Sequence, residues 1–244
     1  MKKVIVFTPA DKNNLKYFEM LKTSLRKFHT EAELPLMLID EEKIKSYDDP
    51  MFFYKATPLV GKELIKEYEY VIKLDADQII TGPLNALWEG DFDVAVVNNS
   101  NPREYKSYPY QILNIHPYSY VNCGCVVMKS EAFIDWWLNS CSSSLFNGFQ
   151  MKEQDLLNIM VHSNNYKLKR LDESDSFYGL ASKGYWANIV MEGDKLVLKK
   201  NKEWPDKDKI IKIIHWAGGN EPGKMNYRTR FQPEVIKRLD ELLK

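Results

Sequence analysis

An α/β fold with a mainly parallel central sheet flanked by helices is predicted from three features of the first forty residues. Apolar runs at Lys3–Phe7 and Leu36–Ile39 are short, as is typical of strands buried on both faces. Between them, Asn14–His29 carries apolar residues at the spacing of an amphipathic helix. A strand-helix-strand order favours a parallel sheet, and ligands of such sheets bind at the carboxyl ends of the strands.

The rest of the chain continues this alternation. Helices are predicted over Tyr54–Tyr68, Ser130–Ser140 with Ser130 as the N-cap, Lys152–Val161 and Pro233–Leu243. Strands are predicted over Asp93–Val97, Tyr120–Lys129, Tyr166–Leu171, Lys195–Lys199 and Ile210–Ile214. Because the sequence has no internal repeat, low-complexity tract or clear linker, we expect a single domain.

Three local features stand out within these segments. Trp136 and Trp137 are expected in the core. The polar stretch Asn98–Tyr110 is long for a loop in a compact domain, and we interpret it as a mobile acceptor-side loop. Gly124 interrupts a predicted strand, which marks a bulge or a close approach of the backbone to another group, such as a ligand.

Composition narrows the classes of function. The 34 Lys and Arg residues balance 34 Asp and Glu, so bulk charge does not favour nucleic-acid binding. The three cysteines have neither the number nor the spacing of a disulfide framework or zinc site. The apolar run Val4–Phe7 is too short for a signal peptide, and no later run reaches the roughly 18 residues of a membrane-spanning helix. We therefore expect a cytoplasmic protein with no integral membrane segment.

Two carboxylates, Asp75 and Asp77, interrupt the apolar run Tyr70–Leu84. We interpret this run as a buried strand, on which residues two apart share one face. Paired carboxylates there repel each other and are costly to desolvate, unless a divalent cation lies between them. Oxygen ligands suit Mg²⁺ or Mn²⁺, particularly when phosphates complete the coordination shell. The alternative for an Asp-x-Asp is an exposed acidic turn, but the buried context favours the metal.

His215 ends a second apolar strand and is followed by Gly218, Gly219 and Lys224. A neutral imidazole is a suitable third ligand for Mn²⁺. The glycines would let backbone amides approach a phosphate, which the lysine would neutralise. Lys55 can reach toward a phosphate or toward the acidic pair, although a solvated surface lysine is the ordinary alternative.

Taken in order, five segments resemble glycosyltransferase family 8, the family of glycogenin and the bacterial lipopolysaccharide galactosyltransferases. IVFTPADKN resembles its nucleotide-binding strand and loop, and YVIKLDADQIITGPL resembles its Asp-x-Asp signature. NCGCVVMK resembles the strand that holds the donor sugar in this family. EQDLLN resembles the family's Asp-Gln-Asp-x-Leu-Asn segment, and HWAGGNEPGK resembles its His-x-x-Gly-x-x-Lys-Pro-Trp motif. Two departures stand out: Lys224 lies nine residues after His215 instead of six, and Glu153 replaces the first Asp of the Asp-Gln-Asp segment.

The resemblance implies a GT-A fold, Rossmann-like and in one domain over residues 1–244. Residues 1 to about 100 would form the nucleotide-binding half, and about 101–244 the donor-sugar and acceptor half. It implies that Asp75, Asp77 and His215 hold Mn²⁺ or Mg²⁺, and that Glu153, Gln154 and Asp155 are catalytic. The residues it implies for donor and cofactor binding are Thr8, Ala10, Asp11, Lys55, Asp75, Ala76, Asp77, Asn122, Gly124, His215, Gly218, Gly219 and Lys224.

The activity implied is transfer of a sugar from a nucleotide diphosphate, with UDP expected, to a hydroxyl of a glycan or glycoprotein acceptor, with retention. Gln154 is expected at the β-face of the sugar, and front-face attack is favoured over a covalent role for this weak nucleophile. One alternative is a sugar-nucleotide nucleotidyltransferase, which normally has a Gly-rich, basic loop after the first strand, unlike TPADKNN. The other alternative is a non-catalytic protein that binds a carbohydrate or a nucleotide sugar. The presence of all three expected metal ligands, Asp75, Asp77 and His215, argues against it.

Overall fold

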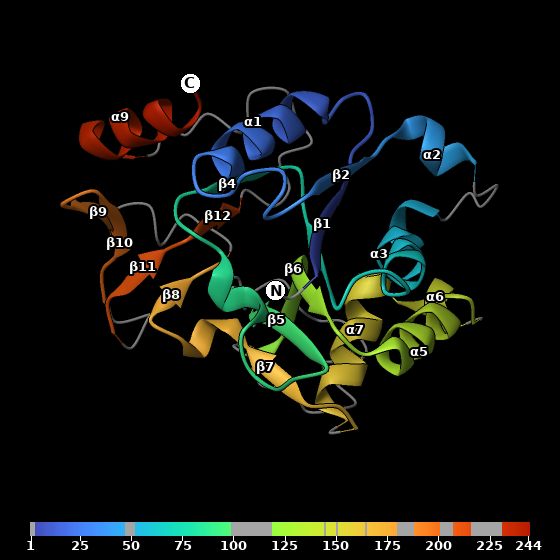
Figure 1. Cartoon of the computed structure of the whole chain (residues 1–244). Coiled ribbons are helices and arrows are strands. Elements are labelled where there is room, and N and C mark those ends of the chain that lie inside the picture. The colour runs from blue at the N-terminus through green and yellow to red at the C-terminus, as the bar shows by residue number, and fades with distance from the viewer. Residues whose placement is uncertain are drawn as a thin grey trace.

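The fold is built on a six-stranded sheet with the strand order β2-β1-β3-β6-β5-β7. The structure, a computed structural model, describes residues 3–46, 52–98, 119–143, 145–149, 151–163, 165–179, 188–200, 207–215 and 231–244. Figure 1 shows the large sheet at the centre, with α3, α5, α6 and α7 to its right and α1 above. A smaller sheet lies to the left, below α9.

The helices and strands have the following bounds. The helices are α1 (Leu15–Arg26), α2 (Glu41–Lys45), α3 (Phe52–Leu64), α5 (Glu131–Cys141), α6 (Leu145–Gly148), α7 (Glu153–His162) and α9 (Pro233–Leu242), with 3₁₀ turns η1 (Asn85–Trp88) and η3 (Leu171–Glu173). The strands are β1 (Val4–Pro9), β2 (Leu36–Ile39), β3 (Tyr70–Leu74), β4 (Gln78–Ile80), β5 (Val94–Asn98), β6 (Val121–Met128), β7 (Leu168–Arg170), β8 (Ser176–Phe177), β9 (Ile189–Glu192), β10 (Lys195–Leu198), β11 (Lys209–Ile211) and β12 (Ile213–His215).

The predicted α/β class with a mainly parallel sheet is confirmed. Strand β1 pairs in parallel with both β2 and β3, and β5 pairs in parallel with β7. Strand β6 runs antiparallel to its neighbours β3 and β5, which brings its first residues beside the carboxyl end of β3. The carboxyl ends of β1 and β3 therefore lie at one edge of the sheet, next to the start of β6.

The prediction of one continuous strand from Tyr70 to the turn at Thr81 is wrong, because the chain leaves the large sheet at Asp75. The amide of Asp75 still donates to the carbonyl of Gly124 at 2.9 Å, and residues 75–77 then turn. Strand β4 pairs antiparallel with β12 in a separate two-stranded sheet. The predicted strand Ile210–Ile214 is divided in the same way, into β11 and β12. Turning out of the sheet leaves both carboxylates partly exposed to water instead of fully desolvated.

Alternation along β1 produces a core on each face of the large sheet. Ile5 and Phe7 pack in one cluster with residues of α3, α5 and α7, whereas Val4 and Val6 pack in another with residues of α1. Ser130 caps α5 as predicted, since its side chain accepts from the amide of Phe133. Because α5 shows one side to the core and the other to solvent, the prediction for its two tryptophans is half right. Trp137 is buried, but Trp136 is 38% exposed.

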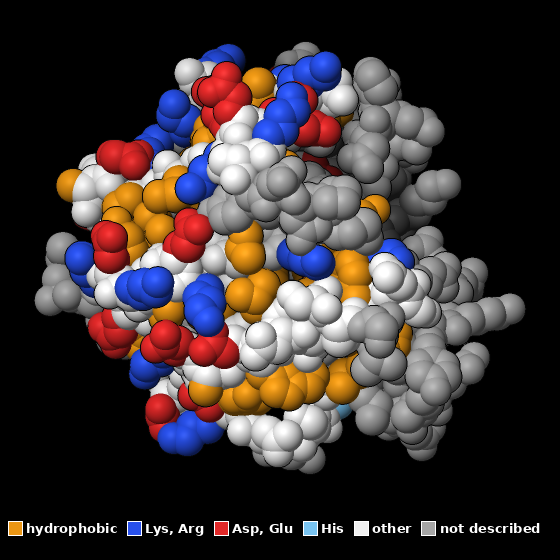
Figure 2. All heavy atoms as spheres, turned by 90° about the vertical axis from the view of Figure 1, so that its right-hand side faces the viewer, with side chains coloured by type: hydrophobic (Ala, Val, Ile, Leu, Met, Phe, Trp, Pro, Cys, Tyr) orange, Lys and Arg blue, Asp and Glu red, His pale blue; other side chains and the backbone are white. Residues whose placement is uncertain are grey.

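The smaller sheet has the order β8-β11-β10-β9, of which β8 and β9 were not predicted. Its apolar residues form a cluster with residues of α1 and α9. None of the helices that the structure describes is long and apolar enough to cross a membrane. Figure 2 shows positive and negative side chains interspersed on one face of the molecule, in keeping with the balanced net charge.

Candidate metal and donor-binding site

The two carboxylates and the histidine that the sequence singles out lie together. His215 Nε2 is 3.3 Å from Asp75 Oδ2 and 3.2 Å from Asp77 Oδ1. One ligand atom from each residue lies within 4.8 Å of the others. The carboxylates come from the turn after β3, and the histidine ends β12, which is anchored by pairing of His215 with Gln78 in β4. Two carboxylates and an imidazole at this spacing fit a divalent ion such as Mn²⁺ or Mg²⁺.

Gly124 makes this approach possible. A Cβ at this position would lie 2.1 Å from Cε1 and 2.4 Å from Nδ1 of His215, and 2.6 Å from Oδ1 of Asn122. The carbonyl of Gly124 accepts a hydrogen bond from the amide of Asp75 and another, at 2.7 Å, from Nε2 of Gln78. The close approach predicted for this glycine is therefore to the imidazole, and the backbone of β6 holds the acidic turn in place.

Charge around the site favours a protonated histidine when no ion is bound. Burial alone would lower the pKa of His215, but the carboxylates of Asp77 and Asp75 raise it to about 9. Burial would raise the pKa of Asp75, but Lys73 and His215 together hold it well below its usual range. A divalent ion would therefore have to displace a proton from the imidazole, since only the neutral ring binds metals.

Lys73 belongs to the site and was missed by the sequence analysis. Its side chain is only 8% exposed, and its ammonium donates to Oδ1 of Asp75 and, at 2.8 Å, to the carbonyl of Cys123. Burial would lower the pKa of this lysine, yet the negative charge of Asp75 raises it. The available signal was a lysine within the otherwise apolar strand YVIKL.

Gln154, in the first turn of α7, is held against the start of β6. Its Oε1 accepts from the amide of Cys123 at 3.0 Å and from Nδ2 of Asn122 at 3.2 Å. Its Nε2 is buried and makes no hydrogen bond of normal geometry among the described residues, although the Gln154 side chain interacts with the hydroxyl of Tyr120. The backbone amide can only donate, so it fixes the carbonyl oxygen of Gln154 toward β6 and leaves the NH₂ group free to donate.

The neighbours of Gln154 have different environments. Asp155 is fully buried, accepting from the hydroxyl of Tyr120 at 2.6 Å and from the amide of Met151 at 2.9 Å, so the protein itself uses both oxygens. Glu153 Oε2 is buried, and none of the described residues forms a hydrogen bond with it. Burial, reinforced by the charges of Asp75 and Asp155, raises the pKa of Glu153 to about 8. Glu153 is therefore largely protonated at neutral pH.

The residues predicted to meet the nucleoside lie at and after the carboxyl end of β1. Thr8 is buried, and its hydroxyl has no hydrogen-bond partner in the part of the chain that the structure describes. Ala10 and Ala76 belong to one apolar cluster. Asp11 Oδ1 accepts from the amide of Asn13 at 3.1 Å, and from the amide and side-chain nitrogen of Asn14 at 3.0 and 2.8 Å. One oxygen of that carboxylate is thus used in the loop that begins α1.

The remaining predicted site residues are placed elsewhere or not at all. Lys55 lies on α3, with its ammonium 5.8 Å from the ring centroid of Phe146. Gly218, Gly219 and Lys224 lie outside the described residues, as does the predicted acceptor-side loop after Asn98.

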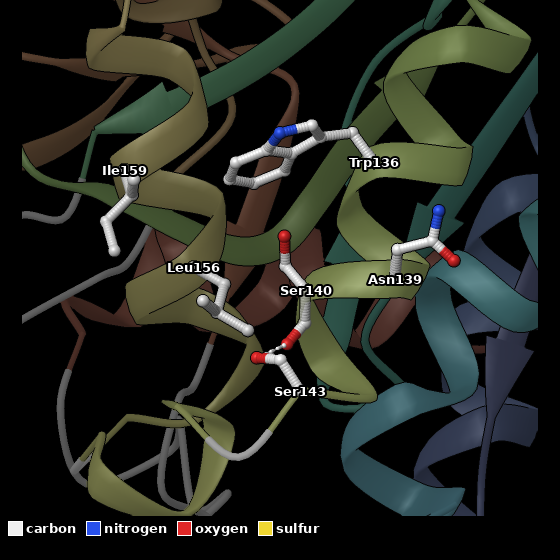
Figure 3. Close-up of a pocket in the computed structure, with 6 residues that line it drawn as sticks. All are labelled: Trp136, Asn139, Ser140, Ser143, Leu156 and Ile159. Carbon is white, nitrogen blue, oxygen red and sulfur yellow. Dashed lines mark hydrogen bonds between the residues drawn. The ribbon is translucent and has the colours of Figure 1, made fainter.

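A separate hollow of about 360 Å³ lies between α5 and α7 (Figure 3). Its lining residues are Trp136, Asn139, Ser140, Ser143, Leu156 and Ile159. The lining is mainly apolar, and the hydroxyl of Ser143 is already bonded to the carbonyl of Ser140 at 2.7 Å. Trp136, which the sequence had suggested for the core, is one wall of this hollow.

Comparisons with known proteins bear on the fold. The chain matches no protein-family model and no curated protein sequence at a significant level. Among solved structures, it is similar to the galactosyltransferase LgtC in complex with donor and acceptor sugar analogues, with a TM-score of 0.64 and 15% identity over 98% of this chain and 95% of that one. It is also similar to the bifunctional glycosyltransferase WbbM, with a TM-score of 0.63 and 14% identity over 99% of this chain and 50% of that one.

A third similar structure is a glycosyltransferase involved in glycosylation of the major capsid of PBCV-1. The TM-score is 0.55, with 10% identity over 99% of this chain and 100% of that one. Identities this low establish shape but not activity. The chain has the GT-A fold that its sequence predicted, the fold of these solved glycosyltransferases.

Proposed function

We propose that this protein is a metal-dependent glycosyltransferase that moves a sugar from a nucleotide diphosphate, UDP in the first instance, to a hydroxyl of a glycan or glycoprotein acceptor. The observation that carries the proposal is the group Asp75, Asp77 and His215, gathered where β1 and β3 end in a GT-A fold. This edge is where open α/β sheets bind their ligands. The two carboxylates and the imidazole supply ligands for a divalent ion at this edge of the sheet, where the ion can also bind a diphosphate.

In this proposal, the ion is Mn²⁺ or Mg²⁺, held by Asp75, Asp77 and His215. When bound, it acts as a Lewis acid that stabilises the negative charge developing on the leaving diphosphate. Thr8, Ala10 and Asp11 would lie beside the nucleoside. Gly218, Gly219 and Lys224 are proposed to contact the diphosphate, as the sequence suggested, and Lys55 is kept as a further candidate.

Retention of configuration is proposed to proceed by front-face attack of the acceptor, with the leaving phosphate as the base. The orientation of Gln154 supports this route over a covalent one, since its carbonyl oxygen is occupied by Cys123 and Asn122. Its free NH₂ group would instead donate to an oxygen of the donor. Glu153, protonated at neutral pH, is proposed to donate to a hydroxyl of the sugar in the same way.

Calorimetry with UDP, with and without Mn²⁺, tests the proposal. We expect UDP to bind the wild-type protein in a Mn²⁺-dependent manner, and Asp75→Asn and Asp77→Asn each to lose that dependence. Asp91→Asn is the matched control, because Asp91 is an exposed carboxylate paired with Lys167 at the surface. Wild-type binding of UDP and Mn²⁺ in both site variants would show that the metal assignment is wrong.

Two further measurements refine the proposal. Competition among UDP, GDP, CDP and ADP tests the nucleobase, and a clear preference for another base would replace UDP without affecting the fold. Hydrolysis of the donor in the absence of acceptor, followed by nuclear magnetic resonance, reports the anomer first released. Initial release of the inverted anomer would refute retention.

A further inference from the structure

Lys73 is a cation enclosed within the proposed metal site. It lies in β3 between Ile72 and Leu74, which are both fully buried. Its ammonium has two protein acceptors, Oδ1 of Asp75 and the carbonyl of Cys123. A buried ammonium is costly unless it is paired, and this contact pairs it with a carboxylate of the acidic group.

The contact divides the carboxylate of Asp75 between two partners. Oδ1 receives the ammonium, whereas Oδ2 faces Nε2 of His215 at 3.3 Å. Asp75 therefore has Oδ2 left for a divalent ion. The two carboxylates of the site carry two negative charges, and Lys73 offsets one of them at close range.

A fixed positive charge this close to a divalent ion weakens its binding, because like charges repel and the buried ammonium of Lys73 is little screened by water. The phosphates of a nucleoside diphosphate would add negative charge on the open side of the ion. That charge would restore the attraction that Lys73 removes. The site would therefore bind the ion weakly on its own and more tightly when a diphosphate is bound with it.

We propose that Lys73 is a positioning residue that couples metal binding to nucleotide binding: it holds Asp75 in place and keeps the site weak for the ion until a nucleoside diphosphate arrives. This inference rests on the proposed function. It predicts that removing the charge of Lys73 tightens binding of the ion alone, which is the opposite of what losing a supporting residue would do.

The test uses Lys73→Gln, which retains N–H donors for Asp75 and Cys123 but removes the charge. Free Mn²⁺ is measured by electron paramagnetic resonance during titration of the full chain, without nucleotide and with saturating UDP. We expect the variant to bind Mn²⁺ alone at least about tenfold more tightly than wild type, and UDP to enhance its Mn²⁺ binding less. Lys62→Gln, at a surface lysine paired with Asp135 at 2.7 Å, is expected to behave as wild type.

Lys73→Arg keeps the charge and should keep the weak binding of Mn²⁺ alone. If Lys73→Gln is unstable, Mn²⁺ alone should raise its melting temperature more than it raises that of wild type. Equal or weaker Mn²⁺ binding by Lys73→Gln, or an equal shift in melting temperature, would overturn the inference while leaving the proposed function intact. Failure of the wild type to bind Mn²⁺ even with UDP would instead overturn the proposed function, and this inference with it.

Discussion

Replacing Gly124 by alanine should disable the metal site while leaving the fold in place. The added methyl group would lie 2.1 Å from Cε1 of His215, whereas ordinary contacts begin near 3.4 Å. One of the two groups must therefore move by about 1.3 Å. His215 is only 2% exposed, its backbone pairs with Gln78, and its amide donates to the carbonyl of Gly179 at 3.2 Å. The imidazole thus has little free space into which it can retreat.

The size of this shift determines the effect expected on metal binding. Metal-ligand distances tolerate deviations of about 0.2 Å, so a displacement of 1.3 Å removes His215 as a ligand. We expect at least a tenfold loss of Mn²⁺-dependent UDP affinity, or ~1.4 kcal/mol. Overpacking in the core should lower the free energy of unfolding by about 1–3 kcal/mol, which a domain of this size can tolerate.

Calorimetry of UDP binding with Mn²⁺, together with urea unfolding, measures both effects of Gly124→Ala. Gly61→Ala is the matched control, because a Cβ there would lie 3.1 Å from the flexible end of Met128 and Gly61 is inside α3. The gain in helix propensity offsets this mild crowding, so the control should bind UDP and Mn²⁺ normally. Normal Mn²⁺-dependent binding by Gly124→Ala would refute the claim that the glycine positions His215.

Three other predictions concern the start of α7. Glu153 has a folded-state pKa of about 8 against an ordinary value of 4.5, so its contribution to stability is complete below pH 4.5 and is lost as pH rises through 8. Glu153→Gln should therefore show a smaller fall in the free energy of unfolding between pH 5 and 8.5, by about 1 kcal/mol or more, when urea unfolding is measured at each pH. A fall as large as that of the wild type would contradict this. Gln154→Ala should bind UDP and Mn²⁺ normally but lose at least about tenfold in donor turnover, because its NH₂ group makes no hydrogen bond of normal geometry among the described residues. Asp155→Ala should instead lose about 2–4 kcal/mol of stability, because it removes the carboxylate that accepts from the hydroxyl of Tyr120 and from the amide of Met151. Normal stability in this variant would argue for a role of Asp155 toward the donor.

The sequence by itself determined the fold class, most of the helices and strands, and the residues of the acidic group. These features depend on signals carried by neighbouring residues. The apolar period identified α1, and a hydroxyl at the right offset identified Ser130 as a cap. Asp75 and Asp77 could be recognised because two carboxylates within an apolar run are costly to desolvate unless a cation binds them.

Only the tertiary structure decided how the site is assembled, because its contacts join residues that are far apart in the chain. Gln78 bonds to Gly124 across 46 residues, and Lys73 bonds to Cys123 across 50. Local periodicity does not record which strand lies beside which. It therefore could not show that the acidic run turns out of the sheet, or that Lys73 turns toward Asp75. The direction of the Gln154 side chain is likewise determined by Asn122 and Cys123 in β6, 32 and 31 residues away, so it could be stated only once the fold was known.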